Sequence, residues 1–112
     1  MGYDTASKSD VESVVPEDAG GMWFLKDALG ADQLGLTVLE LEPGERGMEH
    51  DETGTGQEEV YYVVEGTVEV ELEDETVTLE SEDAIRLDPD ETRQIHNSGN
   101  ERTMLVLAGA PL

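Results

Sequence analysis

The chain has 112 residues, of which 28 are aspartate or glutamate and six are lysine or arginine, so its formal net charge is −22. This charge excludes nucleic acid and anionic membranes as partners, because both are bound through basic surfaces. The chain has no cysteine, which excludes disulfides, thiolate zinc sites and thiol nucleophiles.

The apolar residues divide the chain into two parts. Residues 1–21 contain three of the 26 valines, leucines, isoleucines and phenylalanines, and the other 23 lie in periodic blocks within residues 22–112. Segments with few apolar residues and a high net charge bury too little surface to fold. We therefore expect a loose N-terminal segment over residues 1–21 and a single folded domain over residues 22–112.

The first predicted strands lie on either side of a short turn. Trp23–Leu25 and Leu34–Leu41 are predicted strands, and Ala28–Leu34 has the length for one helical turn between them. Val60–Val64 (VYYVV) is apolar at every position. This pattern is typical of a strand that is covered on both sides.

The following segments alternate apolar and polar residues. Thr67–Glu73 (TVEVELE) has the period of a strand with one buried and one solvated face, and Thr76–Leu79 repeats it after an acidic turn, which predicts a hairpin. Further strands are predicted at Ala84–Leu87, Gln94–His96 and Thr103–Ala108. Many short strands without long helices between them predict an all-β, antiparallel sandwich or barrel.

The acidic residues are spread along the whole chain. Their mutual repulsion disfavours a compact state in dilute buffer and is relieved at 1 M salt, where the Debye length is ~3 Å. The composition resembles that of proteins from extreme halophiles. Residues 1–10 contain no apolar core of signal-peptide length and no stretch approaches a membrane span, so we expect a cytoplasmic protein.

Residues 43–66 (PGERGMEHDETGTGQEEVYYVVEG) resemble the first sequence signature of the cupin superfamily. Gly44 is followed by five residues and His50, which match the glycine, the spacing and the first histidine of that signature. Glu59 is followed by six residues and Gly66, which match its glutamate and its final glycine.

Residues 81–97 (SEDAIRLDPDETRQIHN) resemble the second cupin signature. Asp83, Pro89 and Asn97 match its aspartate, its proline-containing turn and its asparagine. The resemblance implies an antiparallel jelly-roll β-barrel with little helix, and it implies a homodimer.

The chain departs from the family at the metal-ligand positions. In metal-binding cupins, two histidines and a glutamate of the first signature and one histidine of the second hold a divalent metal. Here the first histidine is His50, but Glu52 stands at the second histidine position and Arg93 at the histidine position of the second signature. Glu59 follows after a gap that is about two residues longer than usual.

These departures leave two interpretations of the site open. His50, Glu52 and Glu59 offer one imidazole and two carboxylates, a set that favours an ion of the Mn or Fe class. A guanidinium is never a ligand, because it has no acceptor lone pair. Arg93 could instead neutralise Glu52 or Glu59 by pairing in a metal-free barrel, or it could be free to hold an anionic ligand.

The expected ligand pocket extends beyond the metal positions. Tyr61 lies on the strand face of the glutamate ligand position, and Ile95 lies on the face of Arg93. We expect Tyr61, Arg93, Ile95 and Met48 to line the pocket. His96 points to the opposite side of its strand and is predicted to be a surface or edge residue.

The cupin fold does not by itself identify a function. The first hypothesis is a protein that binds a small molecule, anionic if Arg93 is free, beside a degenerate metal site. The second is an Mn- or Fe-dependent enzyme of the isomerase or dioxygenase type that uses His50, Glu52 and Glu59, with Glu52 or Tyr61 assisting proton transfer. The third is a protein-interaction module with a vestigial cavity. The sequence assigns no catalytic residue among these alternatives.

Overall fold

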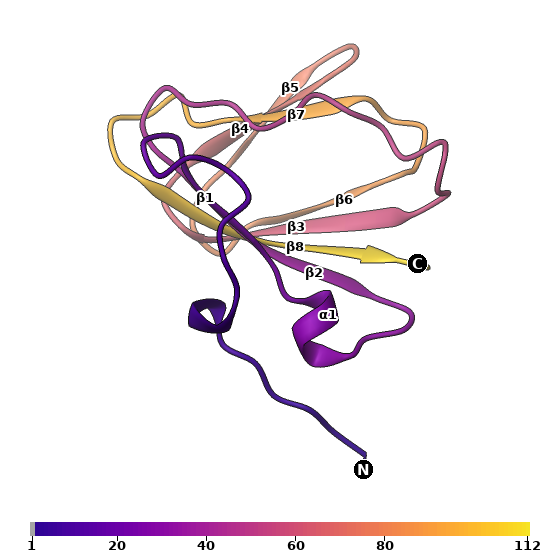
Figure 1. Cartoon of the computed structure of the whole chain (residues 1–112). Coiled ribbons are helices and arrows are strands. Elements are labelled where there is room, and N and C mark those ends of the chain that lie inside the picture. Colours follow the sequence, from indigo (N-terminus) through magenta and orange to yellow (C-terminus); the bar gives the residue numbers. More distant parts are fainter. Residues whose placement is uncertain (1) are drawn as a thin grey trace.

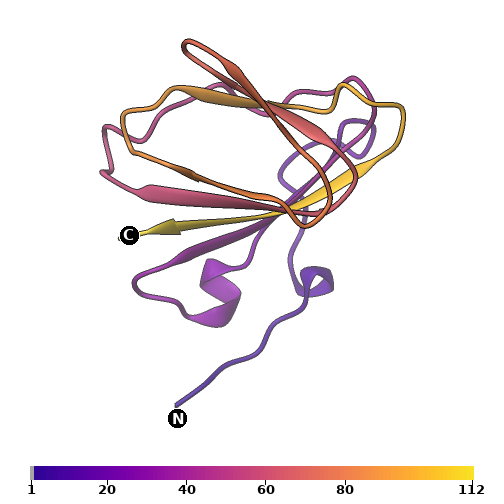
Figure 2. The ribbon, with the colours of Figure 1, turned by 180° about the vertical axis from the view of Figure 1, so that it is seen from behind.

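Two antiparallel sheets form the body of the structure, and the computed structural model describes residues 2–112 (Figure 1). A five-stranded sheet has the order β1-β2-β8-β3-β6, and a three-stranded sheet has the order β5-β4-β7. Figures 1 and 2 show the two sheets as layers that face each other. The strands are β1 (Gly20–Phe24), β2 (Gly35–Leu41), β3 (Glu58–Glu65), β4 (Val68–Leu72), β5 (Thr76–Leu79), β6 (Ala84–Leu87), β7 (Arg93–His96) and β8 (Thr103–Ala110).

The all-β, antiparallel jelly-roll prediction is confirmed. Thr76–Leu79 and Ala84–Leu87 are strands with the predicted bounds, and the other strands differ from the predicted ones by up to three residues at either end. The predicted hairpin is formed by β4 and β5, which pair in antiparallel register. The alternation of apolar and polar residues was therefore sufficient to place most strands.

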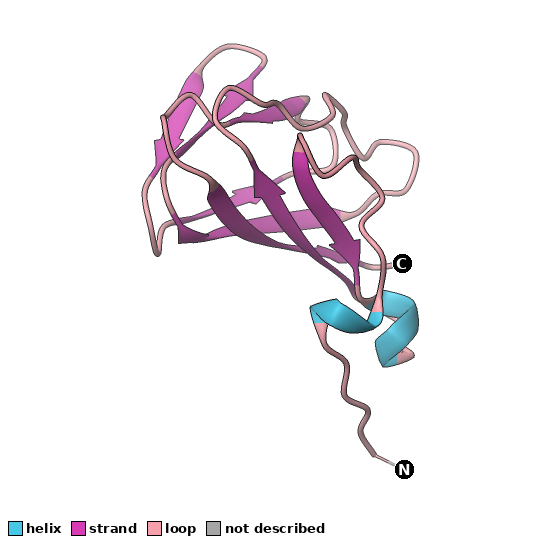
Figure 3. Ribbon diagram, turned by 60° about the vertical axis from the view of Figure 1, so that its left-hand side comes forward, coloured by secondary structure: helices cyan, strands magenta, loops and turns pink. Residues whose placement is uncertain are grey.

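The predicted helical turn over Ala28–Leu34 is wrong in its position. The helix α1 covers Lys26–Leu29, directly after β1. Gly30 ends this helix in the left-handed conformation, with φ at 65°, which glycine adopts without a steric penalty. Figure 3 shows this helix and the 3-10 turn η1 (Lys8–Asp10) outside the sheets. None of the helices in residues 2–112 has both the length and the apolar character that crossing a membrane requires.

The core lies between the two sheets, where every second residue of each strand points inward. On β4 the inward valines are fully buried while the glutamates between them point to the other side. Burial of this apolar surface is the main favourable contribution to folding. The core consists of Leu39, Leu41, Tyr61, Val63, Val68, Val70, Leu79, Leu87, Ile95 and Leu105.

The prediction that Val60–Val64 is covered on both sides is wrong for residues 2–112. Tyr61 and Val63 are buried in the core, but the alternate side chains Val60, Tyr62 and Val64 are 39%, 40% and 41% exposed. Strand β3 therefore carries apolar residues on a face that the described part of the chain leaves open.

The N-terminal residues contact the five-stranded sheet. Lys8 of η1 forms an ion pair with Glu40 of β2, with 2.7 Å between Nζ and Oε2, and its ammonium lies 4.1 Å from the centroid of the Trp23 ring. Strand β1 begins at Gly20. The division into a loose segment and a domain at residues 21 and 22 stays a prediction.

Candidate metal and ligand site

A cavity of about 580 Å³ lies on the inner side of β1, β2 and β8. Its remaining wall comes from the N-terminal segment before β1, from the segment between β2 and β3, and from β3 and β7. The structure brings all seven sequence-predicted site residues to this cavity, from parts of the chain up to 47 positions apart. They are Met48, His50, Glu52, Glu59, Tyr61, Arg93 and Ile95.

His50 is held by both its backbone and its ring. Its backbone N–H donates to the Arg93 carbonyl at 3.0 Å, and the Arg93 N–H donates back to the His50 carbonyl at 2.9 Å. Ring atom Nδ1 lies 3.1 Å from the Met48 carbonyl oxygen. Because a carbonyl only accepts, Nδ1 carries the proton and donates it, which leaves the Nε2 lone pair free.

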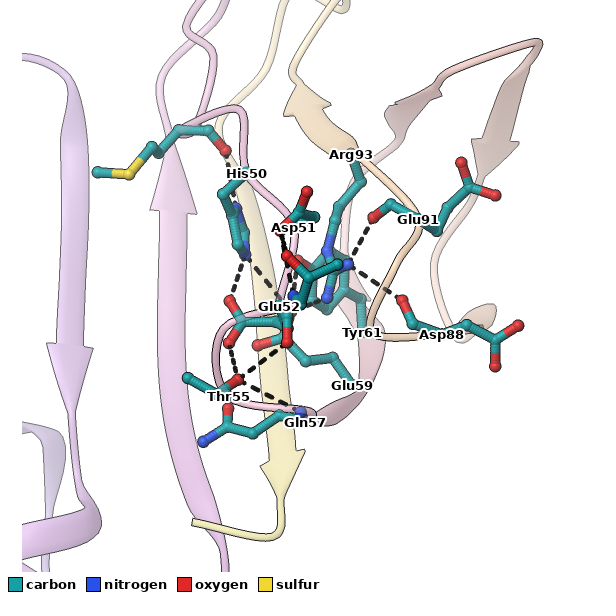
Figure 4. Close-up of polar contacts among 12 residues, drawn as sticks. His50, Asp51, Glu52, Thr55, Gln57, Glu59, Tyr61, Asp88, Glu91 and Arg93 are labelled. Atoms are coloured by element: carbon teal, nitrogen blue, oxygen red, sulfur yellow. Dashed lines mark hydrogen bonds and ion pairs between the residues drawn. The ribbon is translucent and has the colours of Figure 1, made fainter.

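That free lone pair faces two carboxylates (Figure 4). His50 Nε2 lies 3.3 Å from Glu52 Oε2 and 3.5 Å from Glu59 Oε1. One ligand atom from each of the three residues lies within 4.8 Å of the others. Three acceptor atoms that converge in this way could hold a metal ion.

The sequence left open whether Arg93 is paired or free, and the structure shows that it pairs with Glu59. Its Nη2 donates to Glu59 Oε1 at 2.6 Å, while its Nη1 donates to the carbonyl oxygens of Glu91 at 2.6 Å and Asp88 at 3.2 Å. The Arg93 side chain is 0% exposed. The guanidinium is therefore engaged within the protein and is not free to hold an anionic ligand.

Tyr61 completes the environment of Glu59. Its hydroxyl donates to Glu59 Oε1 at 3.1 Å. Burial, and secondarily the nearby Glu59 charge, raises the pKa of Tyr61 well above its usual value, so the phenol keeps its proton. Burial lowers the pKa of Arg93, but the hydrogen bond to Glu59 and the contact with Tyr61 outweigh it and raise that pKa.

The charges of the site do not cancel within it. Glu52 and Glu59 contribute two negative charges when ionised, and Arg93 contributes one positive charge. Glu52 accepts a hydrogen bond from the neutral hydroxyl of Thr55, at 2.8 Å from Oγ1 to Oε1. One negative charge is left beside His50, and a bound cation would compensate it.

A tight turn brings Glu52 into the site. The backbone N–H groups of Thr55 and Gly56 donate to the Glu52 carbonyl at 3.1 and 2.7 Å, and Gly56 has a positive φ of 71°. This turn contains the residues by which the gap in the first signature is longer than usual. The Glu52 N–H in turn donates to the Pro89 carbonyl at 2.7 Å, so the backbone of Glu52 is held on both sides.

Glu59 lies against the backbone of β8, where its cross-strand partner is Gly109. A Cβ atom at Gly109 would lie 3.4 Å from Glu59 Cγ and 3.1 Å from the side-chain oxygen of Gln57. An alanine at this position would require the Gln57 side chain to shift slightly, whereas its contact with Glu59 would be an ordinary one. Gly109 thus contributes to the site by leaving room for the side chains of Gln57 and Glu59.

Sequence reasoning missed several cavity residues in the N-terminal segment. Val14, Val15 and Ala19 line the cavity, and the Val14 N–H donates to the Met22 carbonyl at 2.9 Å. The signal for them was the presence of three valines in an otherwise polar stretch. Gln57, in the segment before β3, also lines the cavity.

The remaining predicted residues differ in their depth. Ile95 is buried in the cavity wall, whereas Met48 is 81% exposed and lies at the rim. His96 lies apart from the cluster, as its strand parity predicted. Its Nδ1 is 3.4 Å from Glu69 Oε1 and 3.4 Å from Arg46 Nη2, on the other side of β7.

Comparison with protein families gives one assignment. Residues 37–109 match the family model described as the cupin domain. Among curated proteins, the chain is 35% identical over 79 residues to a protein of Streptomyces cyaneus named polyketide synthase CurC. This match covers 70% of the chain and 49% of the relative, so the chain spans about half the length of the curated relative that it matches.

Three solved structures are similar in fold. A cupin protein from Bacteroides fragilis has a TM-score of 0.80 at 21% identity, covering 99% of this chain and 86% of that one. A structure from Silicibacter pomeroyi, described as a sugar phosphate isomerase from a cupin superfamily, has a TM-score of 0.77 at 20% identity, covering 97% and 76%. A predicted oxalate decarboxylase from Thermotoga maritima has a TM-score of 0.78 at 20% identity, covering 97% and 100%. At these identities the likeness shows the fold alone.

The buried ion pair leads to the first prediction. Replacing Arg93 with methionine leaves the charge of Glu59 uncompensated, and we expect the free energy of unfolding to fall by about 3 kcal/mol or more. Urea unfolding at constant high salt measures this change. The double variant Arg93→Met with Glu59→Leu should recover most of the loss.

Arg86 provides a matched control for this prediction. It forms ion pairs on the surface, with Glu58 and Asp88, and its side chain is 55% exposed. Arg86→Met should change the free energy of unfolding by less than about 1 kcal/mol. Equal effects at the two positions would contradict a special role for the buried pair.

Proposed function

The chain belongs to the cupin family, and we propose that it binds a small molecule in the barrel cavity beside a divalent metal ion held by His50, Glu52 and Glu59. The observation that carries the proposal is the convergence of three acceptor atoms, with His50 Nε2 at 3.3 and 3.5 Å from the two carboxylates. One imidazole and two carboxylates favour a metal of the Mn or Fe class.

The residues present fit such an ion. The hydrogen bond from Nδ1 to the Met48 carbonyl orients the His50 ring and directs its lone pair to the cluster, which is the usual outer support of a metal-ligating histidine. The pairing of Arg93 with Glu59 leaves one net negative charge for the metal to compensate. When bound, the metal would act as a Lewis acid toward an oxygen atom of the ligand.

The lining of the cavity favours an apolar ligand that carries oxygen atoms. Leu39, Leu41 and Leu107 are among its apolar wall residues. The two arginines that reach it are engaged, since Arg93 donates to Glu59 and Arg46 donates to both oxygens of Glu71 at 3.2 Å. A strongly anionic ligand would find no free guanidinium in this part of the structure, so the small-molecule hypothesis is kept and its anionic version is not favoured.

The curated relative points in the same direction. It is named a polyketide synthase, and polyketides are molecules of this apolar, oxygen-bearing kind. We therefore propose a polyketide-like compound as the ligand class.

A second candidate is a metal-dependent enzyme that acts on the same ligand class. The observation in its favour is the position of Glu52, whose carboxylate belongs to the proposed metal-ligand set and also lines the cavity. A carboxylate in this place could accept a proton from a bound ligand. The isomerase and dioxygenase types expected from the family resemblance both remain within this candidate.

Metal binding is tested first. Protein purified in high salt without chelator and loaded with Mn or Fe should contain about one metal ion per chain by elemental analysis. His50→Ala should lose the metal, because it removes the only imidazole of the cluster. His96→Ala is the matched control and should retain it.

If soaking with Mn, Fe, Ni and Zn leaves the wild-type protein without metal, the metal-dependent proposal is wrong. The metal-free binder would then be the correct interpretation. Equal metal loss in both histidine variants would place the metal outside the proposed site.

The ligand class has a separate test. A hydroxylated aromatic compound of polyketide type should raise the thermal unfolding midpoint in proportion to ln(1 + [L]/Kd), whereas a sugar phosphate should not. Widening the cavity with Leu107→Ala should alter the response to the aromatic compound. Stabilisation by the sugar phosphate alone would contradict the proposed class.

We also propose that the chain functions in a cytoplasm of molar salt. With 28 acidic against six basic residues, self-repulsion should weaken the fold in dilute buffer. The unfolding midpoint should therefore rise between about 0.1 M and 2 M KCl, as the Debye length falls from ~10 Å toward ~3 Å and below. Sorbitol at the same osmolality controls for general solute effects, and a midpoint insensitive to KCl would contradict the proposal.

A further inference from the structure

The N-terminal segment passes from the outer face of the five-stranded sheet to the cavity on its inner side. On the outer face, Lys8 of η1 pairs with Glu40 of β2, and its ammonium lies 4.1 Å from the centroid of the Trp23 ring. Farther along the chain, Val14 and Val15 line the cavity. In Figure 1 this stretch is the indigo chain that leads from the first coil to β1. The segment therefore rounds β1, which is the edge strand of the sheet.

Backbone hydrogen bonds hold the segment at the free edge of β1. The Met22 N–H donates to Ser13 Oγ at 2.9 Å, and the Val14 N–H donates to the Met22 carbonyl at 2.9 Å. At its other end, the Ala19 carbonyl accepts a hydrogen bond from the Glu42 N–H at 3.1 Å. The stretch that lines the cavity is thus fixed at both of its ends.

The cavity has an exposed apolar border. Val14 is 57% exposed, Phe24 of β1 is 50% exposed and Met48 is 81% exposed, and all three also line the cavity. We call these three residues the apolar rim. In a chain in which one residue in four is acidic, acidic side chains are available for exposed positions. Three large apolar side chains around one cavity therefore indicate contact with an apolar group that lies there.

The apolar rim borders both the cavity wall and the carboxylate cluster. Phe24 and Met22 are alternate residues of β1 and both line the cavity, so the wall continues along this strand to the rim. Met48 contacts the cluster through its backbone, since its carbonyl oxygen lies 3.1 Å from His50 Nδ1. A ligand with an oxygen atom at the cluster would therefore find apolar surface from the wall out to the rim.

We propose that the N-terminal segment is part of the ligand site, and that the apolar rim holds an alkyl or aryl substituent that projects from the cavity. The inference rests on the proposed function, because it adds this substituent to the apolar, oxygen-bearing ligand. Val14 is then a specificity-determining residue, since it contacts the substituent. Lys8 is a positioning residue, because its contacts with Glu40 and Trp23 keep the segment in place without touching the ligand.

The test compares a resorcinol that carries a methyl group with one that carries a pentyl group, by isothermal titration calorimetry in 2 M KCl. The wild-type protein should bind the pentyl compound at least about 10-fold more tightly, because burying the longer chain removes more apolar surface from water. Val14→Asp should reduce this preference to less than about 3-fold and leave the affinity for the methyl compound unchanged. Phe24→Ser is a second rim variant and should act in the same direction.

The positioning role of Lys8 has its own readout. Lys8→Met should weaken the preference for the pentyl compound, because the segment loses its ion pair with Glu40. Lys8→Arg keeps the positive charge and should restore the preference. A preference that is equal in the wild-type protein and in Lys8→Met would contradict this role.

Tyr3→Asp is the matched control, because it places the same charge in the N-terminal segment at a residue that is 73% exposed and does not line the cavity. It should keep the wild-type preference. Equal wild-type affinity for both resorcinols, or an unchanged preference in Val14→Asp and Phe24→Ser, would overturn this inference and leave the proposed function standing. Binding of neither compound would overturn the proposed ligand class together with the inference. A ligand-free complex with a second protein chain that Val14→Asp dissociates would assign the rim to that chain and also overturn the inference.

Discussion

The buried ion pair between Arg93 and Glu59 is the interaction on which the site depends. Glu59 lies on β3 of the five-stranded sheet and Arg93 on β7 of the three-stranded sheet, so the pair connects the two layers. It also determines the direction of the Glu59 carboxylate, whose Oε1 accepts from Arg93 and Tyr61 while it faces His50. A guanidinium at a family metal-ligand position thus orders the remaining ligands, although it is not itself a ligand.

The same pair explains how an acidic protein keeps a partly buried carboxylate cluster. All six basic residues form ion pairs, but five of them are on or near the surface, where a pair contributes little to stability. Arg93 alone has a fully buried side chain. It neutralises one of the two carboxylates beside His50 and leaves the charge that a divalent ion would compensate, which supports a metal-assisted binding function over a vestigial cavity.

Most of the fold could be predicted because strand formation follows a local period. The alternation in Thr76–Leu79 was enough to place that strand with its observed bounds. Local pattern was less informative at Ala28–Leu34, where Gly30 ended the helical turn early. It was also misleading at Val60–Val64, because an apolar run does not show whether both faces of the strand are buried in the folded chain.

For the site, the sequence by itself determined which residue types are present and at what spacing, and the family resemblance assigned His50, Glu52 and Glu59 to metal-ligand positions, which the structure brings together. The tertiary structure decided which carboxylate Arg93 neutralises, 34 positions away in the chain. It also decided that Val14 joins the cavity wall. Spacing along a strand fixes the side to which a residue points, whereas partners in different sheets are brought together only by the register and packing of those sheets.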